Sequence, residues 1–171
     1  LYVGGSIPSS IFNNIARWNG TSWVGVATGI DGGTSVGERV MALSSIGGTL
    51  YVGGNYTTSG GQGARNISRY ASGTWTPFSG TGLDSAANAI AILGNDVYVG
   101  GSLVTAGPIT ANKIAKRNGI TNTWSSLASG IFGFGTENSS ISAITVAGGK
   151  VYAGGTFPVI GSTGTLANNV A

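Results

Sequence analysis

The chain has 171 residues, of which 32 are glycine, 41% are hydrophobic and only 8% are charged. A charged fraction about a third of the average, combined with this hydrophobic content, excludes ordinary intrinsic disorder. The net charge of +3 is scattered along the sequence, which does not fit a nucleic-acid-binding protein. No apolar run approaches the roughly 18–20 residues that cross a bilayer, so we expect no membrane insertion.

Histidine and cysteine are absent from the sequence. Their absence excludes Ser-His-Asp and Cys-His nucleophile systems, disulfides, and zinc or copper sites with His or Cys ligands. Paired carboxylates could support glycoside hydrolysis or calcium binding. The sequence has only five acidic residues, and the simpler interpretation is that they are solvated. We therefore expect a protein that is not an enzyme and that has no cofactor and no metal site.

A short anchor of the form hydrophobic-Tyr-x-Gly-Gly opens the chain and returns three times. The intervals between successive anchors are 49, 47 and 54 residues (50 − 1, 97 − 50 and 151 − 97). A period of about fifty residues indicates a repeat architecture. The four anchors are Leu1–Gly5, Leu50–Gly54, Val97–Gly101 and Val151–Gly155.

Three further apolar segments follow each anchor before the next one begins. All are short, rich in β-branched or aromatic residues and bounded by Gly, Asn, Ser or Thr, which predicts strands and almost no helix. The second segment covers residues 14–18, 66–70 and 113–117, with a truncated copy at 169–171. The third segment centres on Trp23, Trp75 and Trp124, and the fourth covers residues 40–46, 87–93 and 141–147.

The connections alternate between tight and long. Gly-rich or Asn-rich turns such as Gly47-Gly48-Thr49 and Asn19-Gly20-Thr21 suit tight hairpins, because Gly and Asn accept positive φ. The connections after each Gly pair and after each tryptophan segment are longer, and we expect them to be irregular. In an up-and-down sheet, both long connections of a repeat lie at the same end. We expect this end to carry variable loops.

Four antiparallel strands per fifty-residue repeat predict a β-propeller blade. The Tyr-x-Gly-Gly strand, the aromatic near the end of the next strand and the following Trp, as in Asn122-Thr123-Trp124, resemble the kelch-type repeat of galactose-oxidase-like propellers. Residues 13–23 are also similar to repeats in large bacterial surface proteins and fungal cortical polarity-marker proteins. Arg117 departs from the pattern, because it replaces the aromatic residue.

The resemblance implies an all-β fold of four-stranded, kelch-like blades. Residues 1–171 would form a single partial propeller of about three and a half blades, part of a larger or oligomeric ring. Because the sequence begins and ends inside a repeat, we expect it to be a piece of something larger. The copper-radical chemistry of galactose oxidase is excluded, since the chain has neither His nor Cys.

Candidate binding residues come from the predicted long-loop end. Aromatic side chains in loops could stack on sugar rings or anchor a protein partner, which selects Tyr56, Phe132 and Phe134. The tryptophans are instead expected to pack between blades. The charged loop residues Arg39, Arg65 and Asp84 complete the candidate site, and possible N-glycosylation acceptors are Asn19, Asn55, Asn66 and Asn138.

These features favour a non-catalytic scaffold of extracellular or cell-surface location that binds a protein or glycan through its long-loop face. One alternative is a structural protein that assembles into a ring or filament by pairing open blade edges. Another is the propeller fragment of a larger enzyme.

Overall fold

A computed structural model describes residues 1–7, 9–31, 37–78, 82–132, 139–160 and 165–166. Every regular element in this part of the chain is a strand, as predicted. None of its segments is a helix long and apolar enough to span a membrane. The chain divides into two compact units, Leu1–Gly82 and Leu83–Ala171, which are described separately. The expectation of a single domain stays a prediction.

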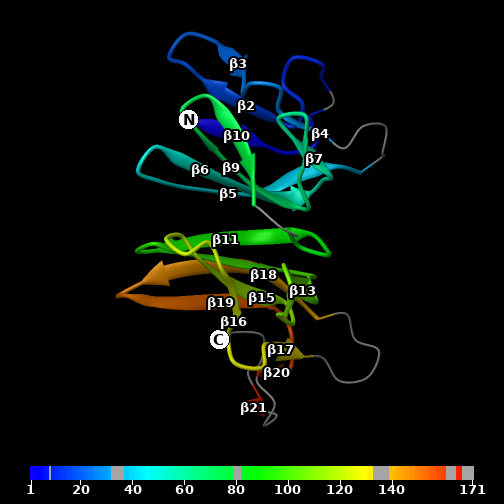
Figure 1. Cartoon of the computed structure of the whole chain (residues 1–171), viewed down its shortest axis with the longest axis vertical. Coiled ribbons are helices and arrows are strands. Elements are labelled where there is room, and N and C mark those ends of the chain that lie inside the picture. Colours follow the sequence, from blue (N-terminus) through cyan, green and yellow to red (C-terminus); the bar gives the residue numbers. More distant parts are fainter. Residues whose placement is uncertain (8, 32–36, 79–81, 133–138, 161–164, 167–171) are drawn as a thin grey trace. The chain divides into compact units, whose positions relative to one another are not determined.

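The first unit contains three antiparallel sheets, two of which are built from the repeat strands (Figure 1). The smaller sheet has the order β1-β2-β3, and the larger has the order β10-β9-β6-β5. A third, short sheet, β4-β7-β8, is built from the long connections. The bounds are β1 (Tyr2–Gly4), β2 (Ile15–Trp18), β3 (Trp23–Gly25), β4 (Ile30–Asp31), β5 (Arg39–Ile46), β6 (Thr49–Asn55), β7 (Thr58–Ser59), β8 (Gln62–Gly63), β9 (Ile67–Ala71) and β10 (Thr74–Pro77).

The second unit repeats the pattern, with a four-stranded sheet of order β11-β12-β15-β16 and a hairpin β18-β19. Short sheets β13-β14 and β17-β20-β21 again come from the long connections. The bounds are β11 (Ala87–Leu93), β12 (Asp96–Gly101), β13 (Thr105–Ala106), β14 (Ile109–Thr110), β15 (Ile114–Asn118), β16 (Trp124–Ser126), β17 (Ile131–Phe132), β18 (Ser140–Ala147), β19 (Lys150–Thr156), β20 (Val159–Ile160) and β21 (Thr165–Leu166).

The four apolar segments of the predicted repeat are therefore strands, and each four-stranded sheet follows the predicted up-and-down order. The fourth segment, the next anchor, the second segment and the tryptophan segment are neighbours, as in β5-β6-β9-β10. This confirms an all-β chain of antiparallel sheets. Closure into a ring of blades is not seen in the described residues, so the propeller stays a proposal.

In the last three anchors, the Gly pair lies opposite a bulge in the fourth segment. The register between β5 and β6 shifts between Val40 and Ala42, and equivalent shifts occur in β11 and β18. A Cβ on Gly54 would lie 3.0 Å from the Val40 Cα and would overlap the Arg39 carbonyl. The prediction that the Gly pair permits a bulge and a close backbone approach is confirmed.

Each repeat sheet has two faces, which we name from the anchor. Face A carries the hydrophobic residues on either side of the tyrosine, such as Leu50 and Val52, and face B carries the tyrosine itself. In the first unit, Tyr2 and Ile15 from face B of β1-β2-β3 join one core with Leu50 and Val52 from face A of the larger sheet. Face B of one sheet therefore packs on face A of the next.

The same packing recurs inside the second unit. A Cβ on Gly100, on face B of β12, would overlap Ile141 and would lie 2.9 Å from the Ile144 Cδ1, on face A of β18. In the first unit, the equivalent Gly4 approaches Val40 and Leu43 in the same way. Glycine is needed at both positions because any side chain would separate the stacked sheets.

Candidate functional site

The long connections are more ordered than predicted. The expectation that they are irregular is wrong in part, because in the described residues the segment after each tryptophan strand pairs with the loop after the next Gly pair. Ile30 pairs with Ser59, Ile131 pairs with Ile160, and Leu83 bridges Ala106. Figure 1 shows β4 and β7 side by side in the first unit.

A sequence signal for these short sheets was present and was not used. A glycine, a branched apolar residue and then Asp or Phe recur after each tryptophan strand, at 29–31, 82–84 and 130–132. The middle residues Ile30, Leu83 and Ile131 are buried in all three copies. The glycine packs against the start of the second strand, because a Cβ on Gly29 would overlap Asn13.

Tyr56 is a core residue, so its assignment as an exposed loop aromatic is wrong. Only 1% of its surface is exposed. Its hydroxyl donates to the Val52 carbonyl at 2.8 Å and lies 2.9 Å from the Ser68 Oγ. Burial of the phenol raises the pKa of Tyr56, and the Ser68 hydrogen bond only partly opposes that shift. Tyr56 closes the core beneath the loop and is not available to a ligand.

The equivalent positions in the other repeats show why. Leu103 and Phe157 also follow the Gly pair by two residues, and both are fully buried. The pattern Gly-Gly-x-hydrophobic is visible in all four repeats of the sequence. Its periodic recurrence is the signal that could have assigned Tyr56 to the core.

Asparagine side chains hold these loops by hydrogen bonds to the loop backbone. The Asn14 and Asn66 Oδ1 atoms accept hydrogen bonds from the backbone N–H of Ile7 and Tyr56, at 2.9 and 3.1 Å. The backbone N–H groups of Asn14 and Asn66 donate to the carbonyls of Ile7 and Tyr56. Both asparagines have positive φ, of 67° and 65°. Lys113 stands at this place in the third repeat, where its Nζ donates to the Ser102 carbonyl at 3.1 Å.

The charged candidates lie at the predicted end of the sheets but serve different purposes. Arg39, which opens β5, and Arg65, which precedes β9, are both exposed in the first unit. Asp84, in the second unit, is exposed, and its Oδ1 accepts a hydrogen bond from the Val104 N–H at 3.0 Å. The Asp84 carboxylate therefore orders its own loop.

The remaining candidates are placed as follows. Phe132 lies in β17 opposite Val159, and its side chain falls outside the described part of the structure, as do Phe134 and Asn138. Among the possible glycan acceptors, the Asn19 side chain accepts hydrogen bonds from the backbone of a tight turn. Asn66 is half-buried, and its side chain is hydrogen-bonded to the Tyr56 N–H. Asn55 is exposed at the end of β6. Their glycosylation stays a prediction.

Two exposed apolar residues of the loops were missed. Ile11 and Val104 are 68% and 47% exposed, in the first and second unit respectively. Val104 directly follows the buried Leu103, so the loop presents one residue outward and buries its neighbour. The local sequence does not show which of Leu103 and Val104 is buried. Alignment of the repeats does, because Leu103 matches the buried position Tyr56.

An apolar surface also covers face A of β1-β2-β3. Leu1, Val3, Trp18 and Trp23 are 78%, 41%, 38% and 43% exposed, and the two indole rings are 5.6 Å apart. In the larger sheet of the same unit, the equivalent face buries Trp75. The expectation that the tryptophans pack between sheets is confirmed for Trp75, whereas Trp18 and Trp23 are exposed.

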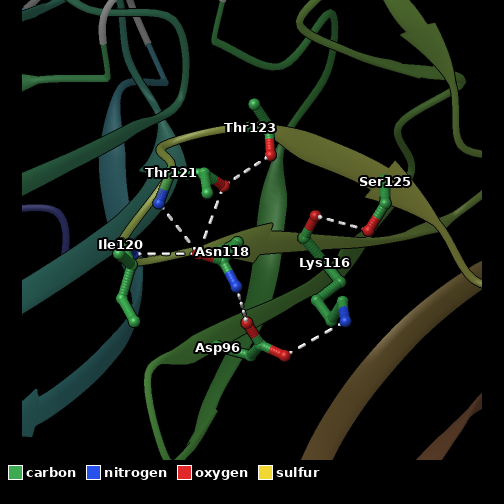
Figure 2. Close-up of polar contacts among 7 residues, drawn as sticks. All are labelled: Asp96, Lys116, Asn118, Ile120, Thr121, Thr123 and Ser125. Carbon is green, nitrogen blue, oxygen red and sulfur yellow. Dashed lines mark hydrogen bonds and ion pairs between the residues drawn. The ribbon is translucent and has the colours of Figure 1, made fainter.

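The tight-turn end of the second unit carries a polar cluster (Figure 2). Asp96 contacts the Lys116 Nζ at 3.1 Å and accepts a hydrogen bond from the Asn118 Nδ2 at 3.0 Å. The hydrogen bond and charge of Asp96 raise the pKa of Lys116. The Asn118 Oδ1 in turn accepts from the Ile120 and Thr121 N–H groups, so the cluster fixes a turn.

Arg117 replaces an aromatic side chain with a cation. In the other repeats, Trp18 pairs with Trp23, and Tyr70 lies 5.0 Å from Trp75. The Arg117 guanidinium lies 5.9 Å from the Trp124 ring and donates to the Asn122 Oδ1 at 2.9 Å. A cation over an indole face is favourable, so the ring–ring contact is replaced by a cation–π contact.

The acidic side chains of the described residues do not gather into one site. Within the described ranges, no three His, Cys, Asp or Glu side chains come together as a metal site. The Asp84 and Asp96 carboxylates are each held by neighbouring backbone or side-chain donors. Two surfaces therefore stand out: the ordered long-loop end and the exposed face A of β1-β2-β3.

No family model and no curated protein matches the sequence. Among solved structures, the chain is similar to the extracellular domain assigned to a one-component system of B. thetaiotaomicron, with a TM-score of 0.54 and 16% identity. The match covers 96% of this chain and 20% of that protein, so the chain spans about a fifth of its length. At this identity the similarity concerns the fold alone.

Proposed function

We propose that this chain is a non-catalytic, kelch-like β-propeller scaffold that binds a protein or glycan through its long-loop end. The observation that carries the proposal is the construction of that end. The loops are held by short sheets, by buried side chains such as Tyr56, and by hydrogen bonds from the loop backbone to asparagine side chains such as Asn66. Arg65 and Val104 are exposed on these loops. Loops that are ordered before binding lose less entropy when a ligand arrives.

An extracellular location is part of the same proposal. The similar solved structure is an extracellular domain, and the low charge and absence of cysteine in this chain are compatible with such a setting. The kelch assignment rests on the recurring anchor and on four-stranded sheets whose strand order matches one blade.

The exposed face A of β1-β2-β3 favours a second candidate, a structural role in self-assembly. Monomeric proteins rarely leave a contiguous apolar surface of this kind without a partner. Leu1, Val3 and Trp23 are the counterparts of Leu50, Val52 and Trp75, which the larger sheet buries against another sheet. A second copy could cover the face in the same way.

Binding of the labelled chain to a glycan array and to immobilised cell-surface proteins tests the first candidate. Arg65→Ala tests the loop end of the first unit and Val104→Asp that of the second, and the variant of the unit that binds should weaken binding at least about tenfold. Lys150→Ala, which removes an exposed charge beside a tight turn, is the matched control and should bind as the wild type does. Loss of binding in Lys150→Ala, with the loop variants unaffected, would move the site to the opposite end and overturn the proposal.

A further inference from the structure

The sequence contains two Asn-Gly pairs, Asn19-Gly20 and Asn118-Gly119. Each opens the tight turn that joins the second strand of a repeat to its tryptophan strand, β2 to β3 in the first unit and β15 to β16 in the second. Asparagine followed by glycine is a chemically reactive pair, because glycine has no side chain to keep its backbone nitrogen away from the asparagine amide. The two turns therefore offer the same reaction in two different environments.

Both turns hold the side-chain oxygen of the asparagine in a similar way. The Asn19 Oδ1 accepts hydrogen bonds from the backbone N–H groups two and three residues further along the chain, both at 2.9 Å. The Asn118 Oδ1 accepts the two equivalent bonds at 3.0 and 2.9 Å, and a longer one from the Thr121 hydroxyl at 3.2 Å. Because the two backbone donors are common to both turns, they do not distinguish the two sites.

The backbone nitrogen that follows each asparagine is held differently. The Gly119 N–H donates to the Asn95 carbonyl at 2.8 Å, and a Cβ on Gly119 would overlap that carbonyl. The Gly20 N–H donates to no backbone carbonyl of the described residues, and a Cβ on Gly20 would have nothing within 4 Å. The Gly20 nitrogen can therefore turn toward the Asn19 side chain, whereas the Gly119 nitrogen must first leave its hydrogen bond.

The side-chain nitrogens of the two asparagines differ as well. The Asn118 Nδ2 donates to the Asp96 Oδ1 at 3.0 Å, a charge-assisted bond inside the cluster of Figure 2. The Asn19 Nδ2 makes a longer contact with the neutral Ser22 Oγ, at 3.4 Å. Asn19 is also exposed, whereas Asn118 is half-buried. The amide and the backbone nitrogen that would react are thus restrained more strongly at Asn118 than at Asn19.

We propose that Asn19 is a site of spontaneous covalent modification, at which the chain converts this asparagine to aspartate and isoaspartate. The Gly20 nitrogen loses its proton to hydroxide and bonds to the Asn19 Cγ, and the Cγ–Nδ2 bond breaks. The departing nitrogen takes a proton from water and leaves as ammonia, which regenerates the hydroxide. A water molecule then opens the five-membered imide at either carbonyl and gives aspartate or isoaspartate. No atom is oxidised or reduced, and the inference does not rest on the proposed function.

The modification changes both the charge and the backbone of the β2–β3 hairpin. A carboxylate replaces a neutral amide, so the net charge of the chain falls from +3 to +2 (3 − 1). Isoaspartate also adds a methylene to the backbone between Trp18 and Trp23, which pair across the two strands with their rings 5.6 Å apart. Because Asn19 is one of the possible glycan acceptors, loss of its amide nitrogen would also remove that acceptor.

Peptide mapping by mass spectrometry, after incubation of the full chain at mildly alkaline pH, measures both sites in one sample. The Asn19 peptide should show the mass gain that replacement of an amide by a carboxyl produces, and an enzymatic methylation assay should detect isoaspartate in it. The same incubation in urea gives the rate of each site without the folded turn. The ratio of the folded rate to the urea rate should be at least about tenfold larger for Asn19 than for Asn118, because Asn118 must first break two hydrogen bonds.

Two variants separate the contributions. Asn19→Ser removes the reacting amide and should abolish the signal in this peptide. Asp96→Ala removes the acceptor of the Asn118 Nδ2 and should speed the reaction of Asn118 several-fold in the folded chain, with Asn19 unchanged. Circular dichroism checks folding, and the comparison with urea needs no variant. The proposal is overturned if the two ratios are equal, if Asn118 has the larger ratio, or if Asn19 reacts only after unfolding.

Discussion

At the scale of single residues, Tyr56 shows how a repeat position decides the role of a side chain. Its aromatic ring in a long loop suggested a ligand contact, yet the structure buries it with the same geometry as Leu103 and Phe157. The backbone of the loop folds over the end of the core and needs a large apolar side chain there. The hydrogen bond from the Tyr56 N–H to the Asn66 side chain then holds the loop in that position.

Tyr56→Phe should lower the free energy of unfolding by about 1–2 kcal/mol at pH 7, because Val52 and Ser68 lose a buried hydrogen-bond partner. The wild-type chain should also lose stability in alkali. Burial raises the pKa of Tyr56 above the value near 10 of the unfolded chain. The contribution of the neutral phenol to the free energy of unfolding is therefore fully present below about pH 10 and falls as the pH rises above it, because the unfolded chain then loses the proton first.

Urea unfolding between pH 7 and pH 11 measures both effects. The Tyr56→Phe variant should show a shallower alkaline loss than the wild type, and Tyr152→Phe, at an exposed position, should retain the wild-type profile. An unchanged alkaline slope in Tyr56→Phe would show that this phenol is not the group responsible.

Gly29 offers a second test at this scale. It has φ of +78°, and a Cβ would overlap the Asn13 side chain, whereas Gly48 has the same φ of +78° with open space around it. Both Gly→Ala changes carry the cost of a left-handed backbone, about 1 kcal/mol. Gly29→Ala should cost at least about 1 kcal/mol more, as measured by thermal and urea unfolding. Equal losses would contradict the close approach of Gly29 to Asn13.

At the scale of elements, the sequence predicted the strands and their order well. The hydrophobic segments, the tight Gly and Asn turns and the Gly pair each report a local requirement of a strand, a hairpin or a bulge. The short sheets of the long connections were missed, because pairs such as β4-β7 and β17-β20 join two-residue strands from successive repeats. Such pairs have too few residues to show a hydrophobic period.

Trp23 and Trp75 illustrate what local sequence leaves open. Both follow a tight turn in the third strand of a repeat, but only Trp75 is covered by a neighbouring sheet. Trp75→Ala should destabilise the first unit by about 3–5 kcal/mol, since it empties a core site and removes one of the two hydrogen bonds that the Val26 carbonyl accepts. Trp23→Ala should cost about 1 kcal/mol or less. Similar losses in urea unfolding would mean that Trp23 is buried as Trp75 is.

At the scale of the whole molecule, the sequence predicted the repeats, and the structure adds how their sheets pack. Face B of one sheet lies against face A of the next inside each unit, through Gly4 in the first and Gly100 in the second. In the proposed function, the choice of ligand would depend on exposed side chains that follow no period, such as Arg65 and Val104. Repeat patterns therefore predicted the strands and sheets more fully than the candidate binding residues.

The exposed face A gives a prediction about assembly. If a second copy covers it, sedimentation velocity of the wild-type chain should show species heavier than the 16.9 kDa monomer as concentration rises. Val3→Glu places a charge on that face and should keep the chain monomeric. Ile120→Glu, at an exposed turn in the second unit, should still associate. A monomeric wild type at every concentration would rule out self-assembly through this face.

The stacking of faces supports the scaffold proposal, and nuclear Overhauser effects measure this stacking most directly. In a methyl-labelled sample, the account predicts contacts from the Gly4 Hα protons to Val40 and Leu43 methyls, and from the Gly100 Hα protons to Ile141 and Ile144 methyls. Absence of both sets from assigned spectra of the folded chain would contradict the account.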